Sequence, residues 1–214
     1  MVEAMCSALA LRLKRLSHRQ RAAEPLRQCW QHSPLRPSQD RNADYLAIDL
    51  ETTALSPDEG EVVSAAWVAV SHGEIDLSSA AHRLLQAKGD VGDSATIHHL
   101  RDCDREGGED AESVMRDLLL AVGGRTLLFH GGTLDMAFLN QLSRRYFAAP
   151  LLLPYIDTLQ QERRRRLRHQ DALTPGELRL ADCRKHYSLP SYPAHNALSD
   201  ALATAELFLA MRSR

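Results

Sequence analysis

The 214 residues are 44% hydrophobic and 25% charged, and 26 basic against 28 acidic side chains leave a formal net charge of −2. This composition predicts one globular domain with a single core, and it excludes collagen, a coiled-coil rod and a fully disordered chain. No apolar run approaches the roughly 18 residues that a membrane span needs. The four cysteines are far apart and include no Cys-x-x-Cys pair, so we expect a reducing, cytoplasmic location without a disulfide framework or zinc ribbon.

Residues 1–43 carry eight Lys or Arg against three acids. Leu9, Leu13 and Leu16 are spaced by four and three residues, which predicts a short amphipathic helix, and the prolines that follow favour a loose linker. We therefore expect a basic extension and linker over 1–43 and one domain over 44–214. Packing against that domain and contact with a partner or nucleic acid are both open roles for the helix. The order of charges argues against a secretory signal, while a transit peptide stays open.

Three β-rich stretches come first in the domain, at 45–51, at 62–70 and from Ile75 onward, and tight connections between them predict an antiparallel meander. Helical periods then alternate with short apolar runs. The further expected elements are a helix from Glu109 to Val122, a strand over 127–129, a helix over 133–147, a strand over 151–156, helices over 158–169 and 177–187, and a last helix from Leu198. This order predicts an α/β fold with a mixed five-stranded sheet flanked by helices.

The first predicted strand ends in two carboxylates. Of three Asp-x-Glu triplets, those at 104–106 and 110–112 lie in a polar stretch, whereas Asp49-x-Glu51 ends an apolar strand. Residues i and i+2 of a strand share a face, so the two carboxylates lie roughly 7 Å apart at the backbone. Their repulsion and lost hydration would be offset by Mg²⁺ or Mn²⁺, which prefer oxygen ligands. The alternative is that Asp49 caps a turn and Glu51 is solvated.

Two further stretches place acids at predicted helix starts. Asp135 follows the strand over 127–129, and Asp200 lies on the first turns of the last helix, five residues after His195. Taken singly, each acid has an ordinary role in compensating a helix dipole, and His195 is a helix-start residue. Taken together, four acids and a histidine lie at the ends of two strands and the starts of two helices.

The order Asp-x-Glu, Asp, His-x-x-x-x-Asp resembles the DnaQ-like, or DEDDh, family of 3′-to-5′ exonucleases over about residues 44–212. The matching motifs are Ile48-Asp49-Leu50-Glu51-Thr52-Thr53, the stretch from Phe129 to Leu139 that contains His130-Gly131-Gly132-Thr133-Leu134-Asp135, and His195-Asn196-Ala197-Leu198-Ser199-Asp200-Ala201. Ile156-Asp157-Thr158-Leu159 is similar to the family's Asp-Thr stretch. The resemblance implies a ribonuclease H-like fold. Position 196 is Asn where a related subgroup has tyrosine, which places the chain in the histidine subgroup.

The resemblance also implies a site and a mechanism. Two divalent ions, Mg²⁺ or Mn²⁺, would be held by Asp49, Glu51, Asp135 and Asp200, with Asp49 bridging both, and His195 would be the general base. The stretch after the first motif would recognise the terminal nucleotide, and the candidates there are Thr52, Thr53 and Leu55. Leu134 and Phe138 are candidates for contact with unstacked bases, although both residues are equally compatible with a place in the core.

Three positions depart from the family pattern, which often has threonine at Leu50, glycine at Ala54 and asparagine at Gly131. Ala54 would cost on the order of 1 kcal/mol if the turn needed a positive φ. Gly131 lacks an amide that could help to position substrate. The arginine-rich run at 163–168 is by default a solvated helix face, with phosphate contact as the alternative.

The expected function is hydrolysis of single-stranded nucleic acid, with DNA favoured, to nucleoside monophosphates. An RNA-processing or oligoribonucleotide exonuclease is the alternative within the same chemistry. The third hypothesis is a relative that binds nucleic acid or a polymerase without turnover. The complete set of acids argues against this hypothesis. The expected partners are 3′ ends of DNA or RNA, and a polymerase or other replication or repair protein could dock through residues 1–43.

Overall fold

The computed structural model describes residues 2–38, 40, 42–86, 107–168, 176–193 and 196–213. Its centre is a five-stranded sheet in the order β3-β2-β1-β4-β5. The first three strands, β1 (Tyr45–Thr52), β2 (Val62–Ser71) and β3 (Glu74–Leu84), are antiparallel neighbours. The last two, β4 (Thr126–Phe129) and β5 (Tyr155–Asp157), run parallel to β1. The expected mixed sheet, a meander followed by parallel strands, is confirmed.

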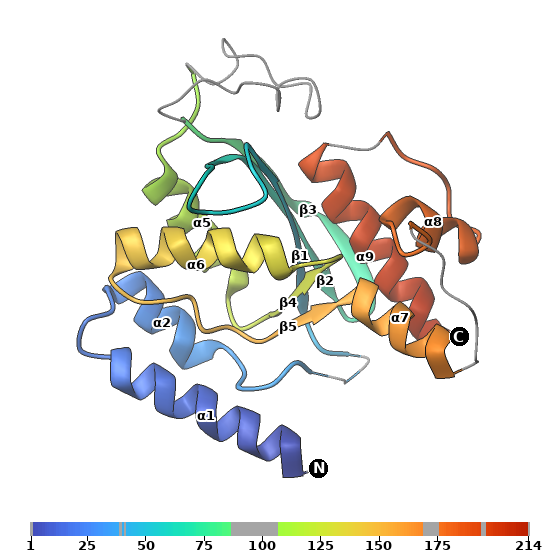
Figure 1. The fold of residues 1–214 in the computed structure, drawn as a ribbon. Coiled ribbons are helices and arrows are strands. Elements are labelled where there is room, and N and C mark those ends of the chain that lie inside the picture. Colours follow the sequence, from blue (N-terminus) through green and yellow to red (C-terminus); the bar gives the residue numbers. More distant parts are fainter. Residues whose placement is uncertain are drawn as a thin grey trace.

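Helices cover both faces of the sheet (Figure 1). On one face lie α5 (Ala111–Val122) and α6 (Thr133–Phe147), and on the other lies α9 (Ala197–Ser213), next to α7 (Thr158–Arg168) and α8 (Leu180–His186). Asp110 caps α5 by accepting hydrogen bonds from the backbone amides of Glu112 and Ser113, so the Asp-x-Glu triplet at 110–112 has a structural role.

Side chains alternate along β1, and this alternation determines which residues face α5 and α6 and which face α9. Leu46 and Ile48 belong to the core under α5 and α6, whereas Tyr45 and Ala47 pack with Phe208 of α9. Because successive side chains of a strand point to opposite faces, the residues that continue the Tyr45 face are Asp49 and Glu51. The strand therefore delivers both carboxylates to the side of the sheet that α9 covers.

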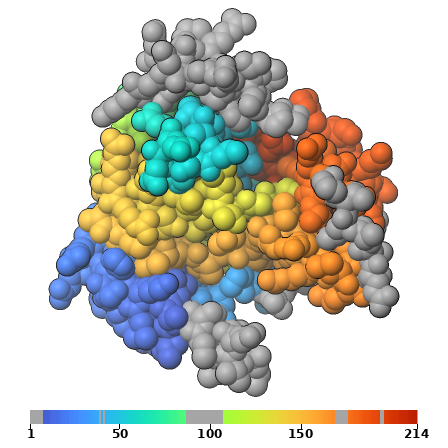
Figure 2. Space-filling model, in the orientation of Figure 1, coloured from blue at the N-terminus to red at the C-terminus, as the bar shows by residue number. Residues whose placement is uncertain are grey.

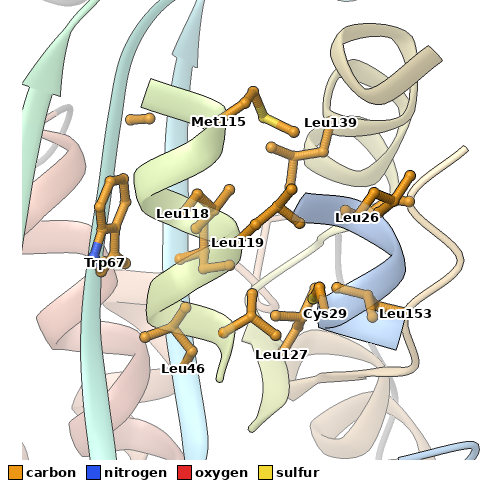
Figure 3. Packing of buried hydrophobic residues seen from close by; sticks show 14 of the residues in the cluster. Leu26, Cys29, Leu46, Trp67, Met115, Leu118, Leu119, Leu127, Leu139 and Leu153 are labelled. Atoms are coloured by element: carbon orange, nitrogen blue, oxygen red, sulfur yellow. The ribbon is translucent and has the colours of Figure 1, made fainter. Parts of the chain in front are cut away.

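The N-terminal region contains two helices, α1 (Val2–His18) and α2 (Glu24–His32). Leu26 and Trp30 of α2 are buried in the main core, and Figure 3 shows Cys29 of the same helix beside Leu153. The Trp30 indole donates a hydrogen bond to the Leu151 carbonyl at 2.6 Å. The expectation of a loose linker is therefore wrong over 24–32, because the apolar side chains of this short helix complete the core.

One buried arginine holds α1 in place. Arg15 is 8% exposed, and its guanidinium donates to the carbonyls of Trp30 at 3.0 Å, Ser33 at 3.1 Å and Leu152 at 3.0 Å. The expected amphipathic helix is present, but Leu9, Leu13 and Leu16 are each more than half exposed. In the part of the chain that is described, polar contacts through Arg15 therefore contribute more to this docking than the leucines do.

Two other elements are shorter than expected. The strand predicted over 151–156 is paired only at Tyr155–Asp157. The backbone just before it is satisfied by side chains, since the Leu151 amide donates to Asn140 and the Leu151 and Leu152 carbonyls accept from Trp30 and Arg15. Leu152 also has a φ of 49°, which a strand does not allow. The helix expected over 177–187 begins only at Leu180.

The last helix is confirmed, but it is buried on more than one side. Ala205 and Phe208 pack against the sheet, whereas Leu207 packs against Cys183 of α8 and against Tyr187, which directly follows that helix. A helix that contacts two neighbours cannot keep all its buried residues on one stripe. None of the described helices combines the length and apolarity needed to cross a bilayer.

Replacing Leu26 by alanine should lower the free energy of unfolding by about 2–4 kcal/mol, because its fully buried side chain leaves a cavity. The matched control is Leu9→Ala on α1, where 59% exposure predicts a change within about 0.5 kcal/mol. Urea titrations followed by fluorescence measure both values. Equal effects of the two substitutions would contradict the assignment of α2 to the core.

Candidate metal centre

Three carboxylates from distant parts of the sequence meet at the end of β1. Asp49 and Glu51 come from the strand and Asp200 from the first turn of α9, and one carboxylate oxygen of each lies within 4.8 Å of the others. Asp49 and Glu51 share a face by strand alternation, and α9 lies across that face (Figure 1). The predicted convergence of these three residues is thus present in the structure.

Asp135 reaches the same strand end from the first turn of α6. Its Oδ1 accepts a hydrogen bond from the Leu50 amide at 3.2 Å, so it lies beside the backbone between Asp49 and Glu51. It also raises the pKa of both neighbours through charge repulsion. All four predicted acids therefore belong to one electrostatic cluster, with Asp135 outside the close group of three.

Burial and charge repulsion raise the pKa values of the carboxylates in this cluster. Burial first, and then the charges of Asp135, Glu51 and Asp200, raise the pKa of Asp49 well above its ordinary value. Burial and the charges of Asp200 and Asp135 raise the pKa of Glu51 to about 7. Burial raises the pKa of Asp135 to about 6, against the lowering effect of its backbone hydrogen bonds. An all-oxygen donor set with this excess of negative charge fits a divalent cation such as Mg²⁺ or Mn²⁺.

Asp157, which the sequence analysis noted only as part of a similar stretch, organises the turn beside this cluster. Its Oδ1 accepts from the amides of Gly131 at 2.9 Å and Leu159 at 3.0 Å, which links the β4–α6 turn to the start of α7. Gly131 has a φ of 80°, a conformation that favours glycine. An aspartate directly before a helix that begins with Thr158 is the sequence signal for this capping role.

His130 is a second residue whose contacts sequence reasoning missed. Its two ring nitrogens lie 2.8 Å from the Thr158 hydroxyl and 2.8 Å from the Leu178 carbonyl. Burial lowers the pKa of this histidine, so the ring is neutral at pH 7 and joins β4, α7 and the segment before α8. Because β4 leads directly into α6, this joint fixes the part of the chain that carries Asp135.

The segment after β1 forms a tight loop. The Thr53 amide donates to the Glu61 carbonyl and the Glu61 amide to Thr53 Oγ1, both at 2.9 Å, and Thr52 Oγ1 donates to the Ala54 carbonyl. Leu55 projects from the loop with 88% exposure. Figure 2 shows this segment, in cyan, against the yellow atoms of α6. Thr52 and Thr53, which directly follow Glu51, are partly buried, and Leu55 is exposed.

The departure at Ala54 has no backbone cost, because Ala54 does not have a positive φ. The close approach falls on Gly60 instead, where an added Cβ would come within 2.6 Å of the Ala54 Cβ. A glycine is therefore needed in this loop, at the position opposite Ala54.

The two apolar candidates differ in burial. Leu134 is partly buried at the edge of the main core, whereas Phe138 is fully buried within it. The core role that the sequence left open for Phe138 is the one its burial supports. His195 lies outside the described residues. Its neighbour Asn196 caps α9, since its side chain accepts from the Ser199 amide at 3.0 Å.

The arginine-rich helix α7 is partly committed to internal ion pairs. Arg166 Nε lies 2.9 Å from the buried carboxylate of Glu162, and the second oxygen of Glu162 accepts from the Tyr187 hydroxyl at 2.8 Å. Arg165 lies 3.9 Å from the same carboxylate. These contacts join α7 to α8, so two of the arginines have a structural role besides any contact with solvent.

Comparison with curated proteins finds a PolC-type DNA polymerase III of Thermotoga petrophila that is 26% identical over 178 residues. The match covers 78% of this chain but only 12% of that polymerase, so the chain spans about an eighth of the relative's length. Among solved structures, cell-death related nuclease 4 matches with a TM-score of 0.64 and 16% identity, over 79% of this chain and 64% of that one. A zinc-bound complex of Escherichia coli exonuclease I with single-stranded DNA matches with a TM-score of 0.68 and 18% identity, over 81% of this chain and 41% of that one.

The two solved structures share the fold, which confirms the expected architecture. A family model described as exonuclease, that of RNase T, matches residues 46–208. This range contains all four acids of the cluster, Asp49, Glu51, Asp135 and Asp200, and also His130 and Asp157. The chain belongs to this exonuclease family, and its resemblance to the DnaQ-like exonucleases is confirmed.

Proposed function

We propose that this protein is a metal-dependent 3′-to-5′ exonuclease that releases nucleoside monophosphates from single-stranded nucleic acid, with DNA favoured over RNA. The observation that carries the proposal is the meeting of Asp49, Glu51 and Asp200 within 4.8 Å in a chain of the exonuclease family. Clustered carboxylates with raised pKa values are costly to keep without a bound cation. A module that only binds nucleic acid would gain nothing from this cost.

The proposed ligands for two divalent ions are Asp49, Glu51 and Asp200, with Asp135 completing the set. Ions held there would supply Lewis-acid activation of water and neutralise charge on the phosphodiester. The protein's own part is to hold the carboxylates in place, through the β1 backbone and through the hydrogen bond from the Leu50 amide to Asp135. The zinc-bound exonuclease I complex supports a divalent ion in this fold.

His195 is the proposed general base. It lies five residues before Asp200 and immediately before Asn196, which caps the helix that carries Asp200. An imidazole titrates near neutral pH, so its neutral form can accept a proton from the attacking water at Nδ1 or Nε2.

Recognition of the 3′ end is assigned to Thr52, Thr53 and Leu55, with Leu134 at the adjacent start of α6. The support is their position: they follow Glu51 directly, and Leu55 is 88% exposed on a hydrogen-bonded loop. An exposed leucine four residues after Glu51 can pack against a terminal base, a contact that does not depend on sequence.

DNA is favoured because the exonuclease I neighbour is a complex with single-stranded DNA and the curated relatives are DNA polymerases. An RNA-processing exonuclease is the alternative, and parallel assays on DNA and RNA oligonucleotides separate the two. A polymerase or repair partner is proposed to dock on residues 1–43, where Leu9, Leu13 and Leu16 are exposed. The exonuclease domain is proposed to span 44–214, with α2 of the preceding segment packed into its core, and its proposed location is the cytoplasm.

Metal should stabilise the protein more at high pH than at low pH. The pKa of Glu51 is raised from 4.5 to about 7, so the folded state holds more protons than the unfolded state, and stability is lost as pH rises through 7. We expect Mg²⁺ or Mn²⁺, at a concentration a hundredfold above its Kd at pH 8, to add about 2.7 kcal/mol at that pH, and the same concentration to give a smaller rise in Tm at pH 5.5. Calorimetry with and without EDTA measures this difference, and an equal rise at both pH values would contradict it.

Asp49→Ala should lower the rate of mononucleotide release by at least about 10³-fold, which is on the order of 4 kcal/mol in the barrier. The assay follows a 5′-labelled, unstructured oligonucleotide with Mg²⁺ or Mn²⁺. The matched control is Glu112→Ala, which should retain full activity. Glu112 lies in the triplet whose Asp110 caps α5, and its carboxylate accepts a hydrogen bond from Arg116. If the labelled oligonucleotide stays at full length with the unaltered protein under both metals, the result would favour the hypothesis of a relative that binds without hydrolysis.

His195→Ala should lower kcat by about 10²–10⁴-fold, while the Kd for the oligonucleotide stays within about threefold, because only proton transfer is removed. The acidic limb of the pH–rate profile should be lost as well. A kcat within threefold of the unaltered protein would remove His195 from the mechanism.

A further inference from the structure

A pocket of about 530 Å³ extends from the carboxylates toward α8. Its lining includes Asp49, Asp200, His130, Arg179, Arg184 and Tyr192, and Ser191 is a further polar residue there. Two of the proposed metal ligands thus share one hollow with two arginines and an aromatic ring. A polyanionic strand at the carboxylates would meet these cations and this ring.

The two terminal nitrogens of the Arg184 guanidinium are engaged in contacts within the protein. Arg184 is 3% exposed, its Nη2 lies 2.7 Å from Glu206 and 2.9 Å from the Pro190 carbonyl, and its Nη1 lies 2.8 Å from the Ala203 carbonyl. Its charge is therefore balanced within the protein. Arg184 thereby links the segment after α8 to α9.

Tyr192 is held by the same group of residues. Its hydroxyl donates to Glu206 Oε1 at 2.8 Å, and the Arg184 guanidinium lies 4.5 Å from its ring centroid. A ring fixed at its hydroxyl and against a buried cation has little freedom to turn. The half-buried Tyr192 therefore forms a rigid wall of the pocket.

Arg179 is the cation left for a ligand. It is exposed, and no carboxylate among the described residues forms an ion pair with it. His130 does not compete, because both its nitrogens are hydrogen-bonded and burial keeps it neutral. Near an excess of carboxylates, a single guanidinium is the group that can offset repulsion of an incoming phosphate.

We propose that this pocket binds the nucleic-acid backbone next to the scissile bond, with Arg179 contacting a phosphate and Tyr192 forming the wall against which the adjoining nucleotide rests. The inference rests on the proposed exonuclease function and adds a substrate contact from a segment outside the acidic motifs. Arg179 acts by binding substrate, so its loss should raise KM and Kd and leave kcat nearly unchanged.

The test compares Arg179→Ala and Arg179→Lys with Arg144→Ala, an exposed arginine at the far end of α6. Binding of a labelled single-stranded oligonucleotide is measured by anisotropy in an Asp135→Asn background, where hydrolysis is slowed, and KM and kcat are measured in the otherwise unaltered protein. We expect Arg179→Ala to raise Kd and KM about five- to tenfold and to reduce the slope of log K against log salt by about 0.7, the value for one phosphate contact on a single strand. Arg179→Lys should lie within about threefold of the parent, and Arg144→Ala should equal it.

Unchanged Kd, KM and salt slope in Arg179→Ala would overturn the proposal, as would an equal loss in Arg144→Ala, which would indicate a general effect of charge. A protein that binds the oligonucleotide through Arg179 without releasing mononucleotides would contradict the proposed function and leave this contact standing. Absence of any binding in the parent protein would contradict both.

Discussion

The structure depends on one unfavourable interaction, the repulsion among carboxylates at the end of β1. Asp49, Glu51 and Asp200 have oxygens within 4.8 Å of one another, and burial together with mutual charge raises the pKa values of Asp49 and Glu51. A core that is anchored on both faces of the sheet can tolerate this local cost. The same cost fits the cluster to a divalent cation, since a bound cation would remove repulsion and desolvation together.

The surroundings of the cluster restrict its geometry from several directions. Asp135 is tied to the β1 backbone through the Leu50 amide, Asp157 ties the turn before α6 to α7, and Arg184 ties the segment after α8 to α9. Each contact joins a different pair of elements around the cluster, so the strand and helices that carry the acids are held in place relative to one another. A site held in this way is already formed before metal or substrate arrives.

How much could be predicted from sequence depended on whether a feature is local. Alternation along β1 predicted that Asp49 and Glu51 share a face, and the start of the last helix predicted Asp200, because period and capping are properties of short stretches. The packing of α2 was not predicted because Leu26 and Trp30 contact α5, α6 and the Leu151 carbonyl, all of which are distant in sequence. The fifth strand was predicted too long for the same reason, since Asn140, Trp30 and Arg15 take up the backbone groups that a longer strand would have used.

The central claim is that these carboxylates form one centre for divalent cations. Anomalous diffraction from a crystal grown with Mn²⁺ tests it most directly, because the signal locates the ion without reference to activity. The account predicts a peak about 2.0–2.3 Å from oxygens of Asp49, Glu51 and Asp200, which is lost in Asp49→Asn. A peak located elsewhere, or a peak that persists in that variant with unchanged occupancy, would contradict it.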